Sequence, residues 1–79
     1  YTREFTCSSI NLQKFAEIPS PIDAVVKIRY KDPGSPALIE QISENRIKVI
    51  FKEPKKAVTP GQSTVFYDGN DLIGGGIID

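Results

Sequence analysis

Residues 57–78, AVTPGQSTVFYDGNDLIGGGII, decide the fold because they combine two turn signals with two short apolar runs. Pro60 sets φ at about −65° and Gly61 tolerates a positive φ, so residues 59–62 are predicted to form a type II turn. Residues 68–71, DGND, carry a second turn signal between the two apolar runs. The segment therefore predicts two antiparallel strands, the first of which follows a tight turn.

Outward from this segment, the chain keeps an alternation of apolar and polar residues with a period of two, which is typical of half-buried strands. Six glycines and six prolines in 79 residues divide it into short pieces. Six pieces are predicted to be strands, at residues 3–7, 24–30, 37–42, 46–51, 63–67 and 72–78. Residues 10–12 and the Pro19-Ser20-Pro21 stretch after them are predicted to be irregular, because prolines interrupt strand pairing.

The alternation also assigns side chains to a buried face. The inward set of two of these strands is Ala24, Val26, Ile28, Tyr30, Ile47, Val49 and Phe51. Six antiparallel strands without a helix to cover them would leave exposed sheet edges, and closure removes those edges. The sequence predicts an all-β fold, a small closed six-stranded antiparallel β-barrel that occupies residues 1–79 as a single domain.

Composition excludes several classes of protein. Cys7 is the only cysteine and the chain has no histidine, so neither an internal disulfide nor a zinc site is expected. No apolar run approaches the roughly 20 residues of a membrane span, and no signal-peptide pattern opens the chain. We therefore expect a cytoplasmic protein that makes no membrane contact. Without histidine, acid–base catalysis would fall to carboxylates beside turns, where solvated Asp and Glu are common, so no catalytic residue is assigned.

Two features could suggest chemistry but have simpler structural interpretations. Gly74-Gly75-Gly76 lacks the lysine and the following helix of a phosphate-binding loop. We interpret it as a run that lets a strand bend or admits a close neighbouring backbone. Cys7 lies in a predicted strand, away from any histidine, and we interpret it as an inert apolar residue.

The formal net charge is zero, but the charges are unevenly placed. Residues 27–56 carry eight basic and four acidic side chains, whereas residues 57–79 carry three aspartates and no base. The outward bases of two predicted strands, with the lysine that follows the first strand, form a basic set of Lys27, Arg29, Lys31, Arg46, Lys48 and Lys52. Such side chains can contact phosphates independently of sequence. Outward bases also keep barrels soluble and protect their edges, so both interpretations stay open.

Most of the chain resembles the C-terminal domain of bacterial tRNA-specific 2-thiouridylases. Residues 57–78 carry most of the similarity, with Thr-Pro-Gly-Gln, Tyr-Asp-Gly and Gly-Gly-Gly at fixed spacing. Further similarity lies in VKIRYK at residues 26–31, IKVIFKEP at residues 47–54 and REFTCSSINL at residues 3–12. The last segment has Leu12 where the family commonly has tryptophan. The resemblance implies a C-terminal barrel of the kind found in elongation-factor domains.

The resemblance also implies a function. Enzymes of this family activate the wobble uridine of certain tRNAs with ATP and Mg²⁺, and replace its 2-oxygen with sulfur from a persulfide donor protein. Their catalytic and central domains would lie outside residues 1–79, so this chain is expected to be a non-catalytic fragment without its own cofactor. Family tRNA contacts correspond to Arg29, Tyr30 and Gln62. Lys27 and Lys31 are candidates for additional phosphate contacts.

Two other functions remain open from the sequence. The barrel could be a structural module that stabilises neighbouring domains, with its charges serving as solvated surface. It could also belong to another enzyme and bind a different RNA or a protein, since one fold serves many functions.

Overall fold

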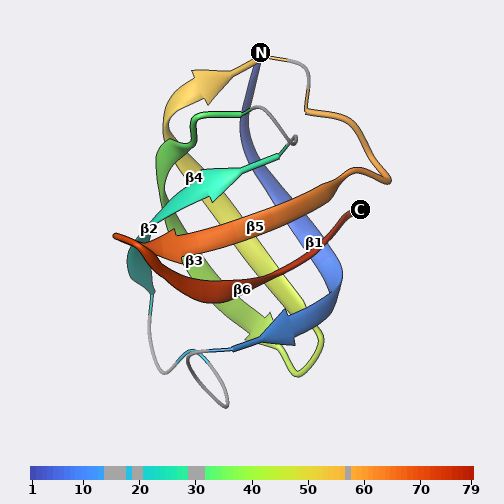
Figure 1. Ribbon diagram of the computed structural model, residues 1–79. Coiled ribbons are helices and arrows are strands. Elements are labelled where there is room, and N and C mark those ends of the chain that lie inside the picture. The colour runs from blue at the N-terminus through green and yellow to red at the C-terminus, as the bar shows by residue number, and fades with distance from the viewer. Residues whose placement is uncertain (14–17, 19–20, 29–31, 57) are drawn as a thin grey trace.

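Six strands close into one antiparallel barrel (Figure 1). The computed structural model describes residues 1–13, 18, 21–28, 32–56 and 58–79. The strands are β1 (Thr2–Leu12), β2 (Ile22–Lys27), β3 (Ser35–Ser43), β4 (Arg46–Lys55), β5 (Ser63–Asp68) and β6 (Asp71–Ile78). Around the barrel they follow the order β1-β4-β3-β2-β5-β6, and β6 returns to β1. The predicted fold is confirmed. No helix in the described part of the chain is long and apolar enough to cross a bilayer.

The barrel interior is filled by the side chains that the alternation assigns to it. Val26, Ile47, Val49 and Phe51 have no exposed surface, and the rings of Phe5 and Phe51 meet with centroids 5.7 Å apart. Ala24 and Ile28 are also buried, while Tyr30 lies outside the described residues. Burying such side chains stabilises a chain of this size by about 1.5–3 kcal/mol for each large residue. The predicted inward faces of β2 and β4 are therefore confirmed wherever the structure describes them.

Strand β1 is longer than predicted and changes partner along its length. Its first half pairs with β4, with Phe5 opposite Val49, whereas its second half pairs with β6, with Asn11 opposite Gly75. Within the pairing with β6 the register shifts between Ser8 and Asn11, and Ser9 there has a φ of 54°. A bulge of this kind adds a residue and bends the strand. The bent β1 can therefore pair with both β4 and β6 and close the barrel. The prediction that residues 10–12 are irregular was wrong.

The glycines of β6 allow neighbouring backbones to approach closely. A Cβ atom placed on Gly75 would lie 2.5 Å from the carbonyl oxygen of Thr64, and one on Gly76 would lie 2.8 Å from that of Ser8. A Cβ atom on Gly74 would meet the carbonyl oxygen of Asn11. The strand is thus flanked tightly by β5 on one side and β1 on the other. This confirms the structural interpretation of the glycine run.

Two turns hold the last hairpin in place. Gly61 has a φ of 90°, and the Gln62 N–H donates to the Thr59 carbonyl at 3.3 Å, as the predicted type II turn requires. Gly69, with a φ of 61°, begins the reversal from β5 to β6. The Gly61 N–H also donates to the Ile78 carbonyl at 2.8 Å, which fastens the first turn to the end of β6.

Candidate nucleic-acid interface

Lys27 and Gln62 lie at the same end of the barrel, at the end of β2 and just before its neighbour β5. Lys27 is the last residue of β2 and pairs with Val65 of β5, and Gln62 immediately precedes β5. The structure therefore places these two predicted RNA contacts at one end of the barrel. The other predicted contacts, Arg29, Tyr30 and Lys31, lie outside the described residues, although they follow directly after the β2 end at which Lys27 and Ile28 lie.

The side chain of Lys27 packs against an aromatic ring. Its Nζ lies 4.9 Å from the centroid of the Tyr67 ring, a distance at which a cation is attracted to the ring face. Its carbonyl oxygen accepts a hydrogen bond of 3.1 Å from Thr64 Oγ1. A ring does not neutralise the ammonium as a carboxylate would. Lys27 can therefore still attract a phosphate.

Gln62 is half-buried beside the turn at residues 59–62. Its Oε1 accepts a hydrogen bond of 3.0 Å from the Thr59 N–H, and its carbonyl accepts one of 2.9 Å from the Ile78 N–H. The side chain thus helps to hold the turn. Because the turn uses Oε1, the Nε2 amide is the part of this side chain that can donate to an outside acceptor.

A buried carboxylate that the sequence analysis missed lies beside this end of the barrel. The Asp32 side chain is 3% exposed and accepts hydrogen bonds of 2.9 Å from the N–H groups of Ile28 and Gly34. Lys55 Nζ lies 3.1 Å from the same carboxylate and donates to Ser35 Oγ at 2.8 Å. The signal in the sequence was Asp-Pro-Gly at residues 32–34, where an aspartate commonly accepts from the backbone two residues ahead.

The environment of Asp32 favours its charged form. Burial by itself raises the pKa of this carboxyl, but the hydrogen bonds from Gly34, Ile28 and Lys55, together with the Lys55 charge, outweigh burial. The net effect holds the Asp32 pKa below its ordinary value. At neutral pH this end of the barrel therefore contains a fully formed ion pair.

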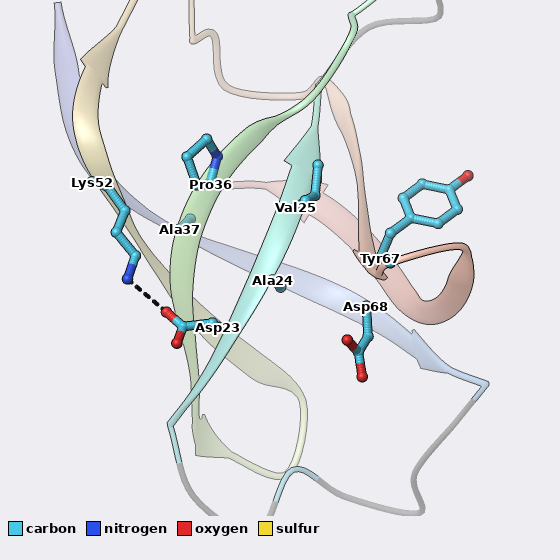
Figure 2. A pocket seen from close by; sticks show the side chains of 9 residues that line it. Asp23, Ala24, Val25, Pro36, Ala37, Lys52, Tyr67 and Asp68 are labelled. Carbon is cyan, nitrogen blue, oxygen red and sulfur yellow. Dashed lines mark ion pairs between the residues drawn. The ribbon is translucent and has the colours of Figure 1, made fainter.

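The three other described members of the basic set all face carboxylates. Lys52 Nζ lies 2.7 Å from Asp23, Arg46 Nη2 lies 3.2 Å from Asp79, and Lys48 Nζ lies 3.9 Å from Glu4. Figure 2 shows the pair of Asp23 and Lys52 reaching across β3. These acids come from parts of the sequence outside the basic middle. For Lys52, Arg46 and Lys48 the solubility interpretation is favoured over phosphate contact.

A shallow groove of about 320 Å³ crosses the outside of β2. Val25 forms its floor, with Pro36 of β3 on one side and Tyr67 of β5 on the other (Figure 2). Asp23 and Asp68 line it as well. Lys52 also lines the groove but is paired with Asp23, so the base that this lining offers is already neutralised and the groove is a poor site for phosphate.

The cysteine is buried and unreactive. Cys7 has no exposed surface, and burial raises its pKa to about 11. Its thiol stays protonated at neutral pH, which confirms the interpretation of Cys7 as an apolar residue. Within the described residues, no cluster of three His, Cys, Asp or Glu side chains could hold a metal ion. The described Gly74–Gly76 run lies inside β6 and offers no loop for the phosphates of ATP.

Comparison with known proteins finds one domain family and several similar curated proteins. Residues 2–78 match the model of the aminomethyltransferase beta-barrel domain. The tRNA-specific 2-thiouridylase MnmA of Carboxydothermus hydrogenoformans is 46% identical over 91% of this chain and 20% of its own length. The corresponding protein of Halothermothrix orenii is 41% identical over 99% of this chain and 22% of its own length. That of Clostridioides difficile is 38% identical over the whole chain. The chain thus spans about a fifth of the length of these curated relatives.

Proposed function

The chain belongs to the aminomethyltransferase β-barrel domain family, and on that premise we propose that it is the tRNA-binding C-terminal barrel of a tRNA-specific 2-thiouridylase. The observation that carries the proposal is the identity of 38–46% with proteins of that name over nearly all of these 79 residues. The resemblance derived from the sequence motifs agrees with these comparisons.

In this proposal the barrel holds tRNA and does not perform the reaction. The thiolation of the wobble uridine, the ATP that activates it and the persulfide that supplies sulfur belong to other domains of a longer cytoplasmic enzyme. The residues of this chain suit such a division, since the thiol is buried and the glycine run lies within a strand. Holding a substrate in a fixed position is itself a large contribution to the rate of a reaction.

The end of the barrel near Lys27 and Gln62 is the surface that we assign to tRNA. Lys27 supplies a positive charge that no carboxylate of the described residues neutralises, and Gln62 supplies an amide donor. Arg29 and Lys31 add two further bases in the same stretch of sequence. Such contacts fix the position of an RNA through its backbone. They also make binding fall with rising salt.

The test measures tRNA affinity across a range of salt concentrations in the full-length protein that carries the barrel. Arg29→Ala should weaken tRNA binding by roughly tenfold and reduce the salt slope by about 0.7–0.9. Lys52→Ala is the matched control, since it also removes one base but from an exposed pair with Asp23. ATP affinity should be unchanged in both. An Arg29→Ala protein with normal tRNA affinity and normal salt slope would contradict the assignment.

The structural alternative makes a different prediction for the same protein. If the barrel only supports neighbouring domains, its removal should lower solubility or folding, and tRNA affinity should fall only in proportion to the folded fraction. If it grips tRNA, the shortened protein should stay folded and bind ATP while losing tRNA affinity. Comparing the melting temperature with the two affinities separates these outcomes.

A further inference from the structure

The outer face of the hairpin formed by β5 and β6 has no charged side chain along most of its length. Residues 63–67 and 72–78, STVFY and LIGGGII, contain no acid or base, and the aspartates of these strands lie at their turn ends. The outer face of β4, by contrast, is rich in bases. Leu72 and Ile77 of β6 are two of the four large hydrophobic side chains that are exposed in the described part of the chain. Exposed apolar side chains that lie together mark interaction sites.

An apolar row continues this face across four neighbouring strands. Pro36 of β3 is opposite Val25 of β2, and Val25 is opposite Tyr67 of β5. Tyr67 is in turn opposite Leu72 of β6. Figure 2 shows the first three of these residues on neighbouring strands. None of the four is buried, and Leu72 is 43% exposed.

A groove lies on each side of the contact between β5 and β6. Tyr67 lines the groove of about 320 Å³ that crosses β2, and its partner Leu72 lines a second groove of about 210 Å³. Val65, Gly75 and the exposed Asn11 also line the second groove. A ridge between two grooves allows a second surface to fit closely against it. We define the β5–β6 face by its outward apolar side chains, Val25, Pro36, Val65, Tyr67, Leu72 and Ile77.

The chemistry of the β5–β6 face fits a protein better than RNA. The centre of a protein interface is poor in charged residues, and tyrosine is common among its strongest contacts. A surface that binds nucleic acid needs bases. Among the described residues that line the two grooves, Lys52 is the only base, and it is paired with Asp23. Lys27 lines neither groove and reaches the face only at its edge, over the ring of Tyr67.

The length of the related proteins indicates which protein surface covers this face. The chain spans about a fifth of the length of its curated relatives, so about four fifths of such a polypeptide lies outside it. A domain joined by a short flexible linker meets its neighbour at an effective concentration in the millimolar range. A small apolar face is therefore enough for docking within one chain, whereas a separate partner needs an interface above about 1,000 Å².

We propose that the β5–β6 face is the surface by which the barrel docks onto another domain of the same, longer polypeptide, with Tyr67 and Leu72 as the central contacts. The contacting surface of that domain is apolar and uncharged. This docking rests on the proposed function for the existence of the longer polypeptide. It leaves the Lys27 end of the barrel at the edge of the interface, where RNA can still reach it.

The experiment measures how fast a thiol reagent modifies single cysteines in the full-length protein without tRNA. Leu72→Cys is compared with Ile42→Cys, because both side chains are 43% exposed on the barrel and Ile42 lies outside the β5–β6 face. Peptide mass spectrometry follows each position separately. Leu72→Cys should react roughly tenfold or more slowly than Ile42→Cys, because docking covers it for most of the time. Equal rates would overturn the proposal.

Two other occupants give different results. If a second copy of the chain covers the face, the slow reaction of Leu72→Cys becomes fast on dilution. If RNA covers it, Leu72→Cys reacts fast until tRNA is added. Either result would overturn the proposal. If Leu72→Cys does not fold, Ile77→Cys takes its place, since Ile77 lies on the same face and is 39% exposed.

A photo-crosslinking amino acid at position 67 supplies an independent measurement. It should form a crosslink within a single chain, to a peptide outside residues 1–79. Crosslinks between two chains, or within the barrel alone, would contradict the docking. Since neither measurement needs tRNA, their failure is distinct from failure of the proposed function. Protected Leu72→Cys together with normal tRNA binding by Arg29→Ala would remove the RNA assignment and leave the docking intact.

Discussion

Lys27 and Tyr67 lie on adjacent strands of the barrel, with the ammonium nitrogen 4.9 Å from the centroid of the ring. This contact differs from those of Lys48, Lys52 and Lys55, which all approach carboxylates. An aromatic partner orients a cation without cancelling its charge. The ammonium group at the end of β2 therefore has an aromatic partner, whereas Lys48, Lys52 and Lys55 are neutralised by carboxylates.

Lys27→Ala should weaken tRNA binding by roughly three- to tenfold and lower the salt slope by about 0.7–0.9, because one phosphate contact is lost. Lys27→Arg should restore most of the affinity, since it retains the charge. Filter binding at several salt concentrations measures both effects. Equal losses for Lys27→Ala and for Lys48→Ala would show that the effect is one of overall charge and not of this position.

Gly75→Ala should destabilise the barrel by about 1–3 kcal/mol, because the added methyl group overlaps the space of a neighbouring backbone. The Cβ atom would lie 2.5 Å from the Thr64 carbonyl oxygen, so the pairing of β5 with β6 would have to shift. Gly69→Asn is the control, since that glycine faces open space and asparagine tolerates a positive φ. Chemical unfolding gives both values. Similar free energies of unfolding for Gly75→Ala and the parent protein would contradict the close approach.

Asp32 should make stability depend on pH in the acid range. Its pKa is lowered in the folded state from the ordinary 3.8, so the folded protein holds the charged form more strongly than the unfolded chain does. The resulting stabilisation is fully present above the ordinary pKa and is lost as the pH falls through the folded value. Urea unfolding of the parent and Asp32→Asn proteins should therefore differ by a constant amount above about pH 5, and the difference should shrink below pH 4. A difference that grows on acidification would have the wrong sign.

The Cys7 thiol should resist modification in the folded protein. Burial removes its accessible surface and raises its pKa to about 11, so little thiolate forms at pH 8. A thiol reagent should label Cys7 only as fast as the barrel opens, and completely in urea. Rapid stoichiometric labelling of the native protein would contradict this, because it would show that the reagent reaches Cys7 inside the folded barrel.

Local sequence patterns predicted most of the fold, because strand alternation and turn residues act over short ranges. The type II turn before β5 and the inward faces of β2 and β4 follow from such patterns. The second half of β1 does not. Its pairing with β6 depends on a bulge at Ser9 and on contacts between residues more than 60 positions apart, such as Asn11 with Gly75. Barrel closure depends on residues far apart in the chain. The sequence around residues 10–12 alone therefore does not show that these residues form a strand.

The candidate site was predicted less completely, for a related reason. Sequence placed Lys52 and Arg46 in a basic set, but their partners Asp23 and Asp79 come from distant segments that the fold brings across the sheet. Likewise, Lys55 lies 23 residues from Asp32, so their pairing was not visible. The sequence shows which charged residues the chain contains. Which of them form ion pairs depends on how the barrel folds.

The most direct test of the central claim places a photo-crosslinking amino acid at position 62 of the full-length protein and irradiates it with tRNA bound. Position 42 serves as the control, because Ile42 is exposed and lies beyond Ile39, whose partner Ile22 begins β2 at the end opposite Lys27. The account predicts a crosslink to tRNA from position 62 and none from position 42. A crosslink from position 42 alone, or from neither position while tRNA is bound, would contradict it.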